Sequence, residues 1–240
     1  MMIMNSLRKF HQKNMLSSLL IVGLSLPAAA QAQSNNAHHE DYRAALNTVV
    51  QSEAKIANAM QQVQSGQVAH YDFLQYEHIE LIRHSRALAW PPSNLAQADK
   101  EALQQEAHAL LDSAQSLEWV ISDYLRAFAQ VRSATANTLD IAEQAALSAN
   151  STLQSSLEAL QVQTLLYMAS AYQGDWESLA QAFDTVLSSD ISEQTQTELL
   201  FQKERLALFA PQLQSQMQAL LDSEVDEQAA HLKARYEAAI

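Results

Sequence analysis

The stretch from His70 to Trp90 mixes ionisable and apolar residues more densely than any other part of the chain. It reads HYDFLQYEHIELIRHSRALAW and is followed by two prolines. At about 100° per residue, one line along a helix holds leucine at every seventh position (Leu74, Leu81 and Leu88). A line beside it holds ionisable residues at the same spacing (His70, Glu77 and His84). Ionisable groups beside an apolar seam need partners, so chemistry is expected here first.

Three of these side chains could share a metal ion. Glu80 is three residues from Glu77 and four from His84, so each adjacent pair lies on one face of a helix. Glu77 and His84 are about 10.5 Å apart along the axis, at about 1.5 Å per residue, so a second helix has to complete the shell. The candidates on other helices are Glu53, Glu106, His108 and Asp112. A tight antiparallel hairpin would place Glu53 near the level of Glu77 and His78. The Glu-x-x-His motif of carboxylate-bridged di-iron bundles does not occur in the sequence.

The alternative is a network of ion pairs, and we favour it. Glu80 can pair with Arg83 or His84 on its own helix, and Arg86 can reach acids on neighbouring helices. Structural ion pairs are common, whereas the metal-ligand spacing is incomplete. Apolar residues occupy much of the remaining circumference (Phe73, Tyr76, Ile79, Ile82 and Ala87), so this helix is expected to be largely buried.

Two further places suggest a metal or a cofactor. His38 and His39 precede two acids and could form a loose surface site for copper or zinc. We favour the start of a helix, because acids in a first turn interact well with the helix dipole. A noncovalent haem between Met60 and His231 is conceivable, but no spacing requires it, and single Met residues in helical cores usually serve packing.

Residues 1–32 have the three parts of a secretory signal peptide. A basic start (Arg8, Lys9 and Lys13) is followed by an apolar run over 15–26. The sequence Ala30-Gln31-Ala32 is then a cleavage signal. The apolar run is too short to cross a bilayer comfortably. We therefore expect cleavage after Ala32 and a mature chain over 33–240 in the periplasm or outside the cell, with no membrane span left after cleavage.

The composition of the mature chain narrows its class. All 27 acids but only 14 − 3 = 11 of the basic residues lie after residue 32, so its net charge is 11 − 27 = −16. No basic residue occurs between Arg132 and Lys203. Such a chain is a poor match for nucleic acid or anionic lipid. The absence of Cys excludes disulfides, zinc–thiolate sites and covalent c-type haem.

The pattern predicts an all-α fold, an elongated up-and-down bundle of about five to six helices without strands, in a single domain over 33–240. Helices are expected over 40–64, ended by Gly66, over 68–89, and from 95 towards 131, with a loop or break at 132–138. The third of these has a seven-residue apolar repeat typical of bundles (Leu103, Leu110, Leu117, Tyr124 and Val131). A helix over 139–172, with core residues Leu153, Leu157, Leu160, Leu165 and Met168, can be interrupted at Asn150. Asp175 is expected to cap a short helix to 187, and Asp190 a last helix that Pro211 kinks or splits.

Catalytic motifs are missing from this chain. It has no nucleophile elbow, P-loop, dinucleotide fingerprint or H-E-x-x-H, and three glycines leave no room for a phosphate-cradling loop. The sequence therefore predicts a non-catalytic, cofactor-free bundle that acts by binding another protein or peptide. The second hypothesis is a periplasmic bundle that binds a divalent transition metal or a noncovalent haem through Glu53, Glu77, Glu80 and His84.

Overall fold

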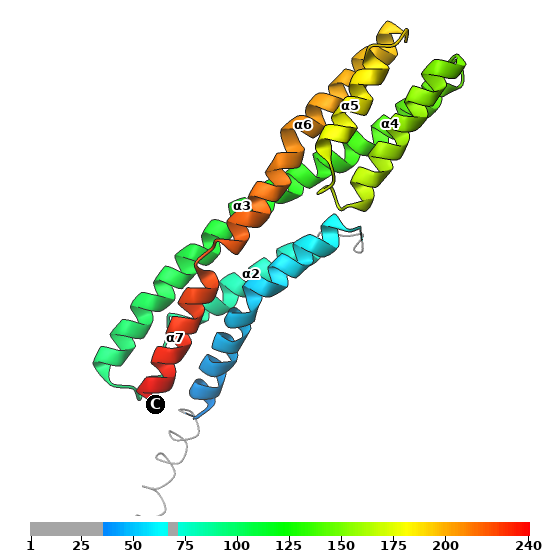
Figure 1. Cartoon of the computed structure of the whole chain (residues 1–240). Coiled ribbons are helices and arrows are strands. Elements are labelled where there is room, and N and C mark those ends of the chain that lie inside the picture. The colour runs from blue at the N-terminus through cyan, green and yellow to red at the C-terminus, as the bar shows by residue number, and fades with distance from the viewer. Residues whose placement is uncertain (1–35, 67–71) are drawn as a thin grey trace, which may run out of the picture.

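The computed structural model describes residues 36–66 and 72–240, and these residues form helices with no β-strand among them. The predicted signal peptide and the predicted start of the second helix at Val68 lie outside the described residues. Figure 1 shows a long, narrow bundle, which confirms the all-α, up-and-down prediction. Within the described ranges no helix combines the length and the hydropathy that a membrane span requires.

Residues 36–64 form the first helical segment. The helices that follow are α2 (Asp72–Leu88), α3 (Gln97–Ala146), α4 (Ser151–Ala169), α5 (Trp176–Leu187), α6 (Glu193–Leu221) and α7 (Val225–Ala239). The first segment ends before Gly66, whose φ of +73° continues the chain in the left-handed region, as the sequence predicts.

Helix α3 is the spine of the molecule. Its 50 residues extend for about 75 Å at about 1.5 Å per residue. Helix α7 runs antiparallel beside its first half, where Arg235 meets Glu106. Helix α6 runs antiparallel beside its second half, where Arg205 donates to the side chain of Gln130 at 2.6 Å. The chain thus returns along α3 in two pieces (Figure 1).

Two four-helix lobes share this spine. The proximal lobe consists of the 36–64 helix, α2, the first half of α3 and α7, and the distal lobe consists of the second half of α3 with α4, α5 and α6. In the proximal lobe, Tyr124 donates from its hydroxyl to the Met60 carbonyl at 2.7 Å. In the distal lobe, the Tyr172 ring stands edge-on to Phe128 at 5.7 Å and to Tyr167 at 6.0 Å.

The inner face of α3 is a seam of leucine, alanine and aromatic residues. The predicted seven-residue repeat is buried along its whole length (Leu103, Leu110, Leu117, Tyr124 and Val131). Alanines lie between these positions and allow close approach of neighbouring helices (Ala107, Ala114 and Ala127). The same seam serves both lobes, because it continues through Ala134 and Ala142.

The predicted break at 132–138 is wrong. Helix α3 runs through this segment, in which Ala134, Thr135 and Thr138 are completely buried. The Thr135 and Thr138 hydroxyls donate to carbonyls one turn earlier in the same helix, at 3.1 and 2.8 Å. Burial and self-satisfied hydroxyls outweigh the low helix propensity of the segment. The interruption considered at Asn150 is confirmed, because α3 ends at Ala146 and Asn150 caps α4.

The last helices also differ from the prediction. Ser192, not Asp190, caps α6 by accepting from the Thr195 amide at 3.1 Å. Of the two effects predicted for Pro211, a kink or a split, the split does not occur, because buried Ala210 and Leu213 on either side of it hold the helix in the distal lobe. The chain breaks at 222–224 instead, and α7 begins there. The prediction for Asp175 is confirmed: its carboxylate accepts from the amides of Glu177 and Ser178.

The turn after α4 places alanine where glycine is usual. The Ala171 amide bonds to the Met168 carbonyl and the Tyr172 amide to the Tyr167 carbonyl, the two bonds of a Schellman motif. Ala171 therefore has a φ of 54°, and Tyr172 follows at 60°. Left-handed backbone is unfavourable for residues with a Cβ. The packing of Tyr172 against Phe128 and Tyr167 holds the turn in this conformation.

We expect Ala171→Gly to stabilise the chain by about 0.5 to 1 kcal/mol, because glycine adopts this φ without steric cost. Urea unfolding of the mature chain measures the change. The matched control is Ala159→Gly, an exposed position inside α4, which should destabilise by about 1 kcal/mol. Equal destabilisation by the two substitutions would contradict a left-handed conformation at 171.

Candidate functional site

Glu53, predicted as a metal ligand, caps α7 in the structure. Its side chain is buried, with 7% of its surface exposed. One carboxylate oxygen accepts from the Ser223 hydroxyl at 2.7 Å and from the Asp226 amide at 3.2 Å. Asp226 is in the first turn of α7, which has no cap from its own residues. A carboxylate there satisfies a free amide and complements the helix dipole.

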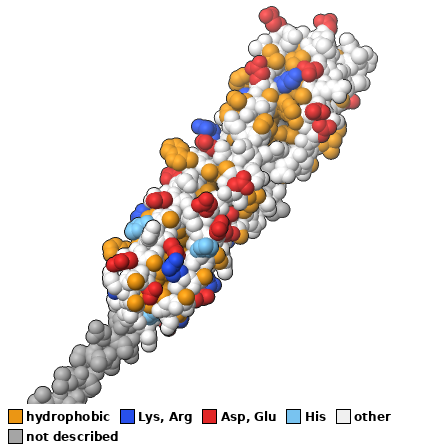
Figure 2. Space-filling model, turned by 60° about the vertical axis from the view of Figure 1, so that its left-hand side comes forward, with side chains coloured by type: hydrophobic (Ala, Val, Ile, Leu, Met, Phe, Trp, Pro, Cys, Tyr) orange, Lys and Arg blue, Asp and Glu red, His pale blue; other side chains and the backbone are white. Residues whose placement is uncertain are grey.

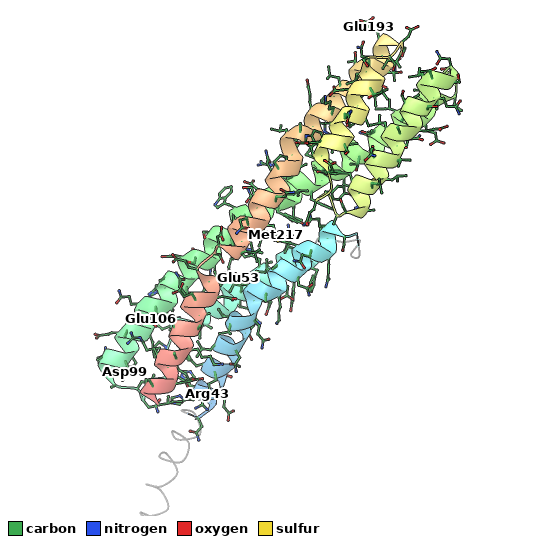
Figure 3. The ribbon with its side chains drawn as sticks, in the orientation of Figure 1. Arg43, Glu53, Asp99, Glu106, Glu193 and Met217 are labelled. Atoms are coloured by element: carbon green, nitrogen blue, oxygen red, sulfur yellow. The ribbon has the colours of Figure 1, made fainter. Side chains whose placement is uncertain are left out.

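Glu53 lies at the predicted height along the bundle axis, but its carboxylate contacts the start of α7 rather than Glu77 on α2. The Tyr42 hydroxyl donates to the Leu88 carbonyl at 3.2 Å, so the antiparallel register places Glu53 about level with Glu77. The carboxylate nevertheless contacts the start of α7, and Figure 3 shows Glu53 beside this end of α7. Burial raises the pKa of the Glu53 carboxyl, and the Ser223 hydrogen bond partly offsets this increase.

The Glu80–His84 pair exists, but an arginine lies on it. Glu80 Oε2 is 3.4 Å from His84 Nε2. The Arg83 guanidinium forms an ion pair with the same Glu80 oxygen and donates to His84 Nε2 at 3.0 Å. A metal ion would need the positions that this guanidinium occupies. The ion-pair alternative describes the geometry better than the metal alternative does.

The remaining predicted ligands are not brought together. Glu77 is half-buried on α2. His78 is buried and donates from Nε2 to the Ala114 carbonyl at 2.9 Å, which ties α2 to α3. Within 36–66 and 72–240, no three His, Asp or Glu side chains are grouped closely enough to hold a metal. His70, the first ionisable residue of the stretch, lies outside the described residues.

His39 has a structural partner at each ring nitrogen, whereas His38 is exposed. His39 Nδ1 is 2.6 Å from the Tyr236 hydroxyl, and Nε2 is 2.8 Å from the Asn94 side-chain oxygen. Tyr236 is completely buried, and burial raises its pKa. The network joins the first helix, the turn after α2 and the C-terminal helix. Metal binding by His39 would require one of these two hydrogen bonds to break.

The haem pairing of Met60 with His231 does not fit the register. The first helix runs antiparallel to α7, with His39 beside Tyr236 and Glu53 beside Asp226. His231 is therefore level with residues near 46, and Met60 lies about 20 Å further along the axis at about 1.5 Å per residue. Met60 is fully buried in the core, whereas His231 is exposed.

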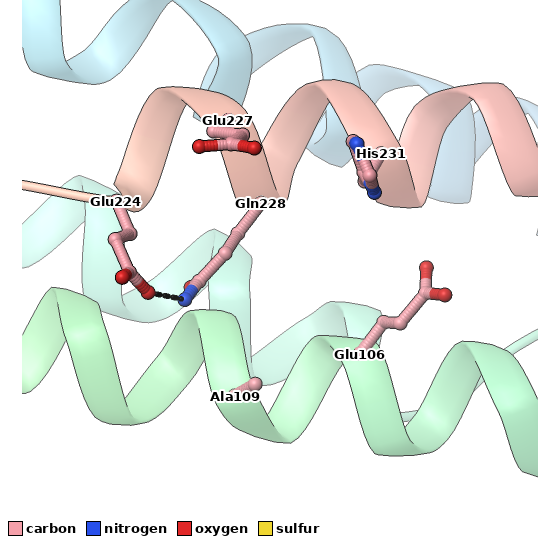
Figure 4. A pocket seen from close by; sticks show the side chains of 6 residues that line it. All are labelled: Glu106, Ala109, Glu224, Glu227, Gln228 and His231. Atoms are coloured by element: carbon pink, nitrogen blue, oxygen red, sulfur yellow. Dashed lines mark hydrogen bonds between the residues drawn. The ribbon is translucent and has the colours of Figure 1, made fainter.

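A small acidic pocket lies between α3 and α7. Its volume is about 250 Å³, and it is lined by Glu106, Ala109, Glu224, Glu227, Gln228 and His231. Figure 4 shows Glu106 facing α7 from α3, and the bond from the Gln228 amide to Glu224 at 3.0 Å. One Glu106 oxygen bonds to Arg235 at 2.5 Å. The sequence named Glu106 as a possible ligand but missed the partners on α7, because they follow an unpredicted helix break.

The exposed apolar residues are the feature that the sequence missed. Helix α2 was expected to be largely buried, yet Phe73, Tyr76 and Ile79 are 43%, 57% and 60% exposed. Ile79 also lines a groove of about 440 Å³ between α2 and α3. In α4, Leu165 was expected in the core but is 52% exposed, next to Leu166 at 57%. Hydrophobicity identifies these residues, but only packing shows that no neighbouring helix covers them.

No protein-family model matches the chain, and neither a curated protein nor a solved structure was found to match it. The fold and the positions of its side chains are therefore the basis for a functional proposal.

We expect Glu53→Ala to cost about 1 to 3 kcal/mol, because the Ser223 and Asp226 donors lose their acceptor. Glu53→Gln keeps an acceptor oxygen and should remain close to wild type at neutral pH. Urea unfolding across a pH series measures both variants. An alanine variant as stable as wild type would contradict the cap.

The raised pKa of Glu53 predicts how the difference in stability between the wild type and Glu53→Gln changes with pH. Protonation of Glu53 favours the folded state, so its stabilising effect is fully present below the ordinary value of 4.5 and is lost as the pH rises through the raised folded pKa. Relative to Glu53→Gln, the wild-type protein should therefore gain stability as the pH falls through that range. A relative loss of stability would contradict the raised pKa.

We expect Glu80→Gln and His84→Gln to change the free energy of unfolding by less than about 1 kcal/mol, because they break a partly exposed ion-pair network. The metal content of the untagged mature protein, measured by mass spectrometry, should be substoichiometric in both variants and in the wild type. A stoichiometric metal that either substitution removes would restore the metal hypothesis.

Proposed function

We propose that this protein is a non-catalytic binding protein that acts by contact with another protein or peptide. The observation that carries the proposal is the arrangement of exposed apolar side chains in rows along single helices. On α2 the row is Phe73, Tyr76 and Ile79, and on α4 it is Val162, Leu165 and Leu166, all more than 40% exposed. Contiguous exposed apolar surface is typical of interaction sites, whereas single exposed residues are common everywhere.

Exposed aromatic residues support the same proposal. Trp119 on α3 is 76% exposed and Trp90 after α2 is 75% exposed. Tryptophan and tyrosine contribute much of the energy of protein interfaces, because they bury a large surface and can still form a hydrogen bond. These residues favour a protein or peptide partner.

The signal-like N-terminus supports a site of action in the periplasm or outside the cell. The mature chain would fold there without disulfides, which agrees with a stability based on an apolar core. The motif inventory of the sequence favours a non-catalytic role. The chain would bind its partner after export.

A photo-crosslinking amino acid placed at Ile79 or at Val162 tests the proposal in the native compartment. Each position should give a defined adduct with another protein, since each lies in an exposed apolar row. The exposed polar position Gln144 is the control and should give none. The crosslinked protein should begin at Gln33, which tests export and cleavage in the same sample. Absence of any adduct at both positions would overturn the binding proposal.

A further inference from the structure

Helix α4 is apolar on two opposite faces. Its inner face is buried in the distal lobe (Leu157, Leu160, Thr164 and Tyr167). Its outward face lies roughly opposite around the helix and is equally apolar (Ala159, Val162, Leu165, Leu166 and Ala169). Val162, Leu165 and Leu166 are 52%, 52% and 57% exposed. An apolar helix face is normally buried, so the exposure of this one indicates that it lacks a partner among the described residues.

The neighbours of α4 do not reach this face. Helix α4 packs chiefly against α3 and α5, and in Figure 1 it forms an edge of the distal lobe. Glu158 is the single charged side chain among its 19 residues, and it extends from the same exposed side. The outward face therefore carries a single charge, and its apolar strip from Ala159 to Ala169 is about 15 Å long at about 1.5 Å per residue and open to solvent.

The lobe around this strip carries a net negative charge, which is concentrated in one continuous segment. Residues 133–202 contain nine acids and no basic residue. The segments 36–132 and 203–240 contain 12 − 7 = 5 and 6 − 4 = 2 more acids than bases, so nine of the 16 net charges lie in 133–202. Figure 2 shows the contrast: the distal lobe displays Asp, Glu and hydrophobic side chains with few Lys or Arg.

The basic residues that follow this segment are already engaged. Lys203 pairs with Asp184 of α5 at 2.5 Å. Arg205 donates to Gln130 of α3 and lies over the Phe201 ring. Neither cation neutralises the acids at the far end of the lobe, among them Asp140 and Glu143 on α3. The surface thus offers an apolar strip in a negative field.

We propose that the outward face of α4 is the docking surface for a basic amphipathic helix of another protein. The apolar row of such a helix would cover Val162, Leu165 and Leu166, and its Lys and Arg flanks would be attracted by Glu158 and by the net negative charge of the lobe. The inference rests on the proposed binding function and names the chemistry of the partner.

Two other occupants fit less well. A second copy of the chain would bring two lobes of the same negative charge together. A membrane surface with anionic lipids would be repelled by the same charge. A basic helix matches both the apolar row and the field.

The test uses the mature chain over 33–240 and a fluorescent 18-residue Leu/Lys amphipathic peptide, which is about as long as α4. Fluorescence anisotropy should show saturable binding that weakens with increasing salt. The variant Val162→Ser/Leu165→Gln/Leu166→Gln should bind at least about tenfold more weakly, because it removes the apolar contact without altering charge. Far-UV circular dichroism should be unchanged, since the three positions are exposed.

The matched control lies in the same lobe. Leu200→Gln/Leu208→Gln on α6 replaces side chains that are 45% and 59% exposed in the same charged surroundings. Its affinity should stay within about twofold of wild type. A Leu/Glu peptide should not bind, because its charge matches that of the lobe.

Equal affinity of the α4 variant and the wild type would overturn the inference, and so would an equal loss in the α6 variant. Binding to anionic vesicles that exceeds binding to the peptide would overturn it in favour of a membrane. A different result would overturn the proposed binding function, namely the absence of an adduct at both crosslinking positions in the native compartment. Adducts without α4-dependent peptide binding would leave the function standing and remove only this partner class.

Discussion

The apolar seam of α3 is the contact on which the rest of the molecule depends. Leu103 and Leu110 pack in the proximal lobe and Val131 in the distal lobe, so one uninterrupted helix forms part of two cores. Helix α3 is continuous, whereas the chain that runs back beside it is divided into α6 and α7, so the break falls in the returning chain. This break lies at 222–224. The buried carboxylate of Glu53 accepts from an amide in the first turn of α7 and so reduces the free energy lost by starting a new helix there.

Local signals in the sequence predicted the fold where local chemistry decides. The heptad of α3, the left-handed Gly66 and the Asp175 cap all follow from one residue and its near neighbours. The failures occurred where tertiary burial overrides propensity. Buried Thr135 carries α3 through a polar-looking segment, and the packing around Pro211 keeps α6 in one piece.

The candidate site shows the same division. The sequence placed Glu53 about level with Glu77, because an antiparallel hairpin fixes level, but the partner of its carboxylate depends on the position of α7. It also identified Arg83 as the competitor for Glu80, which the structure bears out. The exposure of Leu165 could not be inferred, since an apolar helix position looks the same whether or not a neighbour covers it.

The return of the chain in two pieces has a consequence for the order in which the lobes can form. The distal lobe is built from one continuous stretch, from the second half of α3 to the end of α6. The proximal lobe joins the two ends of the described chain, through His39 with Tyr236 and Glu53 with Asp226. A chain that emerges N-terminus first can complete the distal lobe while the first helix still waits for α7. The lobe with the longest loop closure is therefore the last to close, and the 36–64 helix stays without its final partner until the whole chain has emerged.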